Sequence, residues 1–176
     1  LGGTLHRLVD QGHEVTVAYL TSGNLSVPDG EAQKAVDIML DLDESDSSEK
    51  ASFALQVKAD LAGREAFGED SLAIRKLKGL VRRGEARAAM EICGVNSSQI
   101  RFLNLPFYEN VRFRSFEPRE EDIVLVRDLL EQIQPHQIYV TGALSEPTTV
   151  QAVCYSCFQK AFELLRNEDW TKDCRS

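Results

Sequence analysis

The sequence predicts an α/β fold, a Rossmann-like three-layer α/β/α arrangement around a mostly parallel sheet. Short apolar runs typical of buried parallel strands occupy Glu14–Leu20, Ile100–Leu105 and Gln137–Gly142, and segments with helical apolar spacing separate them. The chain also opens on a helical segment, and Gly2-Gly3 resembles the end of a strand-to-helix loop. We therefore expect the first strand of the sheet to be missing, and the chain to be a fragment truncated at both ends.

Bulk composition favours one soluble globular domain over residues 1–176. The 176 residues are 43% hydrophobic and 27% charged, which is enough apolar material for a single core. The net charge of −8 argues against a nucleic acid as the main partner, because binding a polyanion needs clustered positive charge. No apolar run approaches the ~20 residues of a membrane span and no signal-peptide pattern is visible, so a cytoplasmic location without a membrane partner is expected.

The first part of the chain is predicted to alternate helices and loops. Residues 3–11 have helical apolar spacing, and Gly12 is a typical cap at the end of that helix. Residues 21–29 favour a loop, residues 32–42 favour a helix, and about residues 41–50 form an acidic, serine-rich linker. The aspartates of this linker resemble those of a calcium loop, but the glycine and the closing glutamate of that pattern are missing.

A longer amphipathic helix is expected over residues 73–93, ended by Gly94. Its solvent face is predicted to include Lys78 and Arg82. The predicted apolar stripe consists of Ile74, Leu77, Leu80, Val81, Ala88 and Ile92. Arg82 and Glu85 have the i, i+3 spacing of a surface ion pair, which is the simplest interpretation of both residues.

The next candidate site residue, Glu109, follows the carboxyl end of the predicted strand Ile100–Leu105. Ligands of open α/β sheets bind just past the carboxyl ends of the strands, so topology makes Glu109 a candidate. A solvent-facing loop acid is an equally good interpretation. Pro118 is predicted to open another helix, with Asp122 among the first-turn acids that favour the helix dipole.

The last predicted helix, residues 150–165, carries Cys154 and Cys157 on its apolar stripe. A redox or zinc pair needs an exposed setting that stabilises thiolates, so core packing is the expected role of this pair. The turn Gly142–Val150 lies just before this helix, where a sheet of this class places its chemistry. It offers one carboxylate and three hydroxyls, with no histidine and no aspartate.

Four segments occur in a characteristic order. They are GGTLHRLVDQGHEVTVAYLTSGN, the motif Arg82-x-x-Glu85 running into Gly94-Val95, FLNLPFYE, and QPHQIYVTG. Together they resemble the LmbE/PIG-L family of metal-dependent N-acetylglucosaminyl de-N-acetylases over about residues 1–166. The likeness is greatest to the domain that is fused C-terminally to glucosamine-6-phosphate deaminase in some bacteria, and it implies an amino sugar or sugar phosphate as the small-molecule partner.

The resemblance also implies a zinc ion as the cofactor of the family. A His-Pro-Asp-Asp motif, which supplies two zinc ligands and the general base, would lie before Leu1. Alignment of the turn after the third strand places Gln151 at the remaining ligand histidine, and Thr148 at the histidine that steadies the tetrahedral intermediate. Threonine and glutamine are poor zinc ligands beside imidazole. We therefore expect no catalytic residue, no metal ligand and no bound zinc in this chain.

The substrate side of the family site is expected to remain. Arg82 matches the helix arginine that faces the sugar, and Glu109 stands in a Phe-Tyr-Glu segment like that of similar family members. The expected function is an amino-sugar de-N-acetylase domain, acting on an N-acetylglucosamine-type amide, that is catalytically degenerate. The alternatives are a non-catalytic amino-sugar-binding or interaction module associated with a fused or partner glucosamine-6-phosphate deaminase, and a truncated product without a stable fold.

Overall fold

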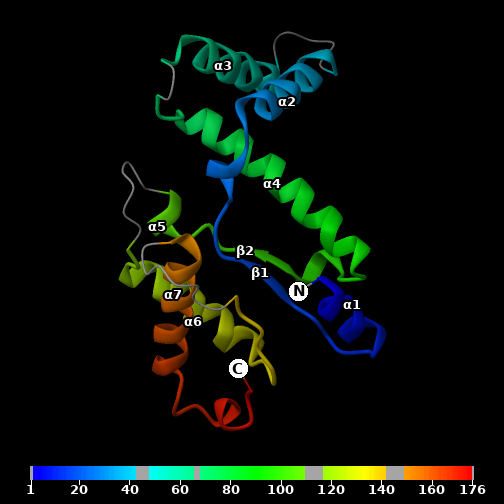
Figure 1. The fold of residues 1–176 in the computed structure, drawn as a ribbon, viewed down its shortest axis with the longest axis vertical. Coiled ribbons are helices and arrows are strands. Elements are labelled where there is room, and N and C mark those ends of the chain that lie inside the picture. The colour runs from blue at the N-terminus through cyan, green and yellow to red at the C-terminus, as the bar shows by residue number, and fades with distance from the viewer. Residues whose placement is uncertain (1, 43–47, 66–67, 110–116, 142–148, 176) are drawn as a thin grey trace. The chain divides into compact units, whose positions relative to one another are not determined.

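The computed structural model describes residues 2–42, 48–65, 68–109, 117–141 and 149–175. The chain divides into two compact units, each with its own hydrophobic core. Unit 1 comprises Leu1–Val17 and Ser22–Arg101, and unit 2 comprises Ala18–Thr21 and Phe102–Ser176. Helices dominate both units (Figure 1). No helix in the described ranges is both long and apolar enough to cross a membrane.

Unit 1 is built mainly from helices. They are α1 (Gly2–Asp10), α2 (Asp29–Asp41), α3 (Glu49–Gly63) and α4 (Leu72–Ile92). Gly12 follows α1 with φ 80°, and Gly94 follows α4 with φ 77°, as the predicted glycine caps require. The predicted helices over 3–11, 32–42 and 73–93 are thereby confirmed to within a few residues.

Helix α3 was not predicted, and it corrects the extent of the acidic linker. Ser48 begins it, since the Ser48 side chain accepts a hydrogen bond from the Ala51 amide at 3.0 Å. Ala51, Ala54 and Val57 then line its buried side. Residues 48–50 therefore belong to a helix start rather than to a linker, and residues 43–47 lie outside the described part of the chain.

Helices α2, α3 and α4 pack around one core, as Figure 1 shows at the upper end of unit 1. Its buried members are Ala32, Val36, Ala54, Val57, Ala73, Ile74 and Leu77. The buried side of α4 differs from the predicted one. Leu80 and Ile92 are 48% and 81% exposed, whereas Lys78, predicted on the solvent face, is only 5% exposed. Burial of an ammonium group against the apolar pattern requires a charged partner, which is described below.

The sheet consists of two strands in the described residues, β1 (Val17–Tyr19) and β2 (Ile100–Phe102). The amides of Leu103 and Leu105 donate to the carbonyls of Tyr19 and Leu20, at 2.9 and 2.8 Å, so the two segments run in the same direction. Two of the three predicted strands are thus present, in shorter form. A parallel pair among helices fits an α/β fold, and the three-layer arrangement stays a prediction.

The third predicted strand, Gln137–Gly142, is wrong for the residues described. Gln137 forms only an isolated parallel bridge to Arg175, and Tyr139 is 46% exposed. A strand needs a continuous ladder of hydrogen bonds, and the chain near Arg175 supplies partners only for His136 and Ile138. Gly142 lies outside the described residues.

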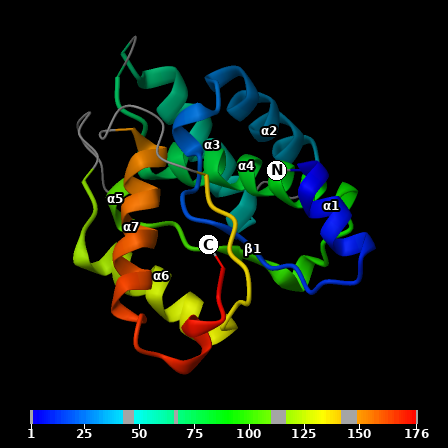
Figure 2. The same cartoon turned by 60° about the horizontal axis from the view of Figure 1, so that its bottom comes forward.

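Unit 2 contains α5 (Pro106–Glu109), α6 (Glu120–Ile133) and α7 (Val150–Leu164). Helices α6 and α7 pack side by side (Figure 2). Their core holds Leu105, Phe107, Tyr108, Val126, Leu130, Val153, Cys157, Phe158, Ala161 and Leu165. The predicted helices after Pro118 and from Val150 are confirmed.

Candidate functional site

The predicted site residue Arg82 lies on α4, in unit 1. Ser71 begins this helix by accepting a hydrogen bond from the Ile74 amide at 3.2 Å. Gly79 and Arg82 are one turn apart on it and lie against the loop that follows β1. A Cβ added to Gly79 would be 3.5 Å from Cβ of Ser22, which is ordinary van der Waals contact. Helix α4 therefore holds Arg82 at the surface of this loop.

Gly23 is the point of closest approach between the loop and Arg82. Its backbone has φ 68° and ψ 12°, in the left-handed region that favours glycine. A Cβ at this position would be 3.3 Å from Arg82 Nε and 3.5 Å from Arg82 Cγ. The aliphatic part of the Arg82 side chain thus lies over the backbone of Gly23. The position of the guanidinium therefore depends on residue 23 having no side chain.

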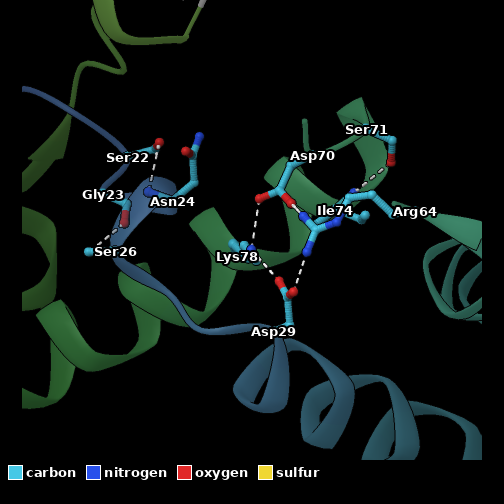
Figure 3. Close-up of polar contacts among 10 residues, drawn as sticks. All are labelled: Ser22, Gly23, Asn24, Ser26, Asp29, Arg64, Asp70, Ser71, Ile74 and Lys78. Carbon is cyan, nitrogen blue, oxygen red and sulfur yellow. Dashed lines mark hydrogen bonds and ion pairs between the residues drawn. The ribbon is translucent and has the colours of Figure 1, made fainter. Parts of the chain in front are cut away.

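Local hydrogen bonds give the same loop a defined shape. The Ser26 hydroxyl donates to the Gly23 carbonyl at 2.8 Å, and the Asn24 amide donates to Ser22 Oγ at 3.4 Å (Figure 3). Asn24 is 1% exposed, so the loop carries a buried amide side chain. The sequence predicted only loop-forming chemistry here; the adjacent Ser-Gly-Asn triplet is the signal that could have identified an ordered turn.

Arg82 forms the predicted ion pair with Glu85, and both side chains are 47% exposed. An ion pair of this exposure contributes little to stability. Its effect is to orient the guanidinium while leaving donors accessible to solvent. A guanidinium has five N–H donors in a planar fork that matches phosphate oxygens or neighbouring hydroxyls. This arrangement can bind an anionic or polyhydroxylated small molecule.

The second predicted site residue, Glu109, lies in unit 2 at the end of α5. Its amide donates to the Leu105 carbonyl at 3.2 Å, and its side chain is partly exposed. Its neighbours Phe107 and Tyr108 are buried in the core of unit 2. The short helix therefore fixes Glu109 past the carboxyl end of β2, as predicted. Arg82 and Glu109 belong to different units.

Asp122 organises the chain around Glu109, and sequence reasoning missed this role. The carboxylate is fully buried, at 0% exposure, and accepts hydrogen bonds from the amides of Phe107 at 2.9 Å and Arg119 at 2.7 Å. It thus joins the start of α6 to the start of α5. The sequence indicated only a first-turn acid, because the contact with Phe107 spans 15 residues.

The cysteine pair of α7 packs in the core, as predicted. Cys157 is 0% exposed, and Cys154 packs against the same cluster. Burial raises the pKa of Cys157 to about 12 and that of Cys154 to about 11, with the charge of Asp122 acting in the same direction. Both thiols stay protonated at neutral pH, which is the inert form.

Among the described residues, the position that the family resemblance assigns to a zinc ligand is Gln151. The turn 142–148, which includes Thr148, lies outside the described residues. Gln151 is exposed on the first turn of α7, where a glutamine amide is a poor zinc ligand. Across the described ranges, no three His, Cys, Asp or Glu side chains are grouped to hold a metal ion.

Comparison with known proteins defines the class to which this chain belongs. The family described as "PIG-L: GlcNAc-PI de-N-acetylase" matches residues 1–151, so the chain belongs to the PIG-L family and carries a de-N-acetylase-like domain. Metal dependence, generally through zinc, is a property of this family.

One relative gives a more particular likeness. The chain is 39% identical over 184 residues to a protein of Bacteroides thetaiotaomicron named as glucosamine-6-phosphate deaminase-like. That match covers 99% of this chain and 27% of the relative, so the chain spans about a quarter of the length of the protein it matches. No solved structure matches the chain.

Proposed function

We propose that this chain is an amino-sugar de-N-acetylase domain of the PIG-L family that keeps the sugar-binding side of the site and is catalytically degenerate. The observation that carries this proposal is the Gly23–Arg82 arrangement. A half-exposed guanidinium is held by its stem against an ordered loop, and its ion pair with Glu85 leaves donors free for a ligand. Glu109, at the end of α5 in unit 2, is proposed separately as a sugar-binding residue.

The loss of hydrolytic activity is supported by the side chains that stand where metal ligands are expected. Amide hydrolysis in this class needs a metal-activated water and a group that stabilises the tetrahedral intermediate. Thr148 and Gln151 stand where the family resemblance expects histidines. Neither side chain can replace imidazole as a zinc ligand or as a cationic hydrogen-bond donor.

Titration calorimetry with glucosamine 6-phosphate and with N-acetylglucosamine tests the binding part. Saturable binding of one of them is expected, and Arg82→Ala should abolish it because the guanidinium fork is lost. Arg87→Ala is the matched control, since it removes an exposed arginine from the same helix away from Gly23 and should leave the affinity unchanged. Flat titrations with both sugars for the wild-type chain would refute the proposal.

Metal content and acetate release test the degenerate part. After dialysis against zinc-free buffer, the chain is expected to hold much less than one zinc per molecule and to release no acetate from N-acetylglucosamine. One tightly held zinc, together with zinc-dependent acetate release, would show an active enzyme instead.

A non-catalytic binding or interaction module associated with glucosamine-6-phosphate deaminase is the second candidate. The name and length of the Bacteroides relative favour it, because this chain corresponds to only part of a longer deaminase-like protein. Addition of the chain should then change the sugar-phosphate dependence of a partner deaminase without any acetate being released. Unchanged deaminase kinetics at saturating chain would exclude this role.

A further inference from the structure

A charged network joins the start of α2 to α4, one turn before Arg82. Lys78 Nζ donates to Asp29 Oδ1 at 2.8 Å and to Asp70 Oδ2 at 2.7 Å, and Arg64 pairs with both carboxylates (Figure 3). The Lys78 side chain is 6% exposed and that of Asp70 is 10% exposed. Two cations and two anions thus neutralise one another around a buried Lys78, while the side chain of Asp29 is 51% exposed.

The network holds one end of the segment that forms the Arg82 loop. Asp29 is the first residue of α2, and the chain from Ser22 to Asp29 follows α4 (Figure 3). At the other end of this segment, Gly23 lies against Arg82. Lys78 and Arg82 are four residues apart on α4, so they project from neighbouring turns of the same side. The segment is therefore fixed to α4 at both ends, by packing at Gly23 and by an ion pair at Asp29.

We propose that Lys78 and Asp29 are positioning residues of the amino-sugar site, whose ion pair holds the Ser22–Pro28 segment so that Gly23 supports Arg82. This inference rests on the proposed function of Arg82. Stability alone does not account for the pair, because Asp29 is half exposed and an ion pair with a solvent-exposed partner contributes little to stability. A directional ion pair adds a defined geometry, since Lys78 can satisfy Asp29 and Asp70 together only when the start of α2 is in one place.

Hydrogen exchange on the full chain tests the positioning directly. Asp29→Asn removes the charge and keeps the side-chain volume, while Lys78 and Arg64 both keep Asp70, so the variant leaves no buried cation without a partner. The Ser26 and Val27 amides, which donate to the carbonyls of Gly23 and Asn24, should exchange about tenfold faster, as expected for the loss of a charge-assisted hydrogen bond.

Two controls separate positioning from general loosening. Asp37→Asn removes an exposed ion pair with Lys58 from the same helix and should leave exchange at Ser26 and Val27 unchanged. Amides at the end of α4, Cys93 and Gly94, should keep their wild-type exchange in both variants. Unchanged exchange at Ser26 and Val27 in Asp29→Asn, or equally faster exchange throughout α2, α3 and α4, would overturn the inference.

Ligand affinity gives the second readout. Affinity for glucosamine 6-phosphate should fall about tenfold in Asp29→Asn, stay at the wild-type value in Asp37→Asn, and recover in part in Asp29→Glu, which restores the charge. Faster loop exchange with unaltered affinity would also overturn the inference. If the wild-type chain binds no amino sugar, the proposed function fails, and the exchange result alone decides whether Asp29 positions the loop.

Discussion

The side chain of Arg82 lies across Gly23, and a Cβ at residue 23 would be only 3.3 Å from Arg82 Nε. This contact links the one candidate ligand-binding cation of the PIG-L domain to a backbone conformation that favours glycine, with φ 68°. A residue on a helix and a residue in a loop, 59 positions apart in the sequence (82 − 23), therefore form one structural unit. The predictions below test this unit and the networks that hold the chain around it.

Gly23→Ala is expected to impair both stability and binding. The left-handed backbone should cost about 1–2 kcal/mol for alanine, and the new methyl group should displace Arg82 and weaken binding of glucosamine 6-phosphate. Gly12→Ala is the matched control, because Gly12 also has positive φ, 80°, but nothing lies within 4 Å of its added Cβ. Urea unfolding should show a similar loss of unfolding free energy for both variants. Calorimetry should show a loss of affinity for Gly23→Ala alone. Equal affinities in the two variants would contradict the role of Gly23.

Lys78→Met should be strongly destabilising. In this variant Arg64 is the remaining cation for both Asp29 and Asp70, and Asp70 is only 10% exposed. Loss of a hydrogen bond between charged groups typically costs about 1.5–3 kcal/mol, and Arg64 still pairs with both carboxylates. Lys58→Met is the control, since Lys58 and Asp37 are about half exposed and 3.5 Å apart, and its effect should stay within about 0.5 kcal/mol. Equal unfolding free energies for the two variants would show that the network contributes nothing specific.

The stability contribution of Asp29 should disappear in acid. The hydrogen bond from Lys78, aided by the charges of Lys78 and Arg64, lowers the pKa of Asp29 below its ordinary value of 3.8. A carboxyl with a lowered pKa stabilises the folded state fully above its unfolded pKa, and this contribution is lost as pH falls through the folded value. The difference in unfolding free energy between the wild type and Asp29→Asn should be constant from neutral pH to about pH 5 and shrink below about pH 4. If this difference in unfolding free energy grew as the pH fell, the pKa of Asp29 would be raised by folding, which would contradict the prediction.

Asp122→Asn should destabilise unit 2. An amide has one acceptor oxygen and cannot serve the buried Phe107 amide and the partly buried Arg119 amide as the two carboxylate oxygens do, so one donor loses its acceptor at a cost of about 1–3 kcal/mol. Asp128→Asn, in an exposed pair with Arg127, is the control and should be nearly neutral. Fluorescence of Trp170, the one tryptophan, reports unfolding because Trp170 packs against Phe162 in unit 2. Coincident curves for both variants would contradict the role of Asp122.

Local sequence signals predicted most of the helices well. Apolar spacing and a terminal glycine are sufficient for α1 and α4, and Pro118 with its acidic first turn is sufficient for α6. These signals work because a helix is stabilised by contacts between residues three and four apart, which the sequence displays directly. Family membership was also accessible, since the motifs around Gly23, Arg82 and Glu109 resemble those of the PIG-L family, and the family match over residues 1–151 confirms the membership.

Strands and buried charges were predicted less well. Residues 137–141 have the apolar composition of a strand but form one bridge, because a strand exists only where a neighbouring strand supplies its hydrogen bonds. Lys78 was assigned to solvent by helical periodicity, yet it is buried against Asp29, 49 residues away. Periodicity treats every lysine as exposed, and only a distant carboxylate can reverse that assignment.

The sequence by itself determined most of the helices, the family and the residue types at the candidate site, because each depends on near neighbours or on motif order. The tertiary structure alone decided that Gly23 supports Arg82, that Lys78 holds Asp29, and that Asp122 joins α5 to α6. These contacts depend on how helices and loops pack, and a long-range contact leaves no periodic trace in the sequence. The physical reason is that a buried charge, or a backbone with no room for a side chain, is stable only where the folded chain brings a suitable partner close to it. Proximity in space decides these contacts.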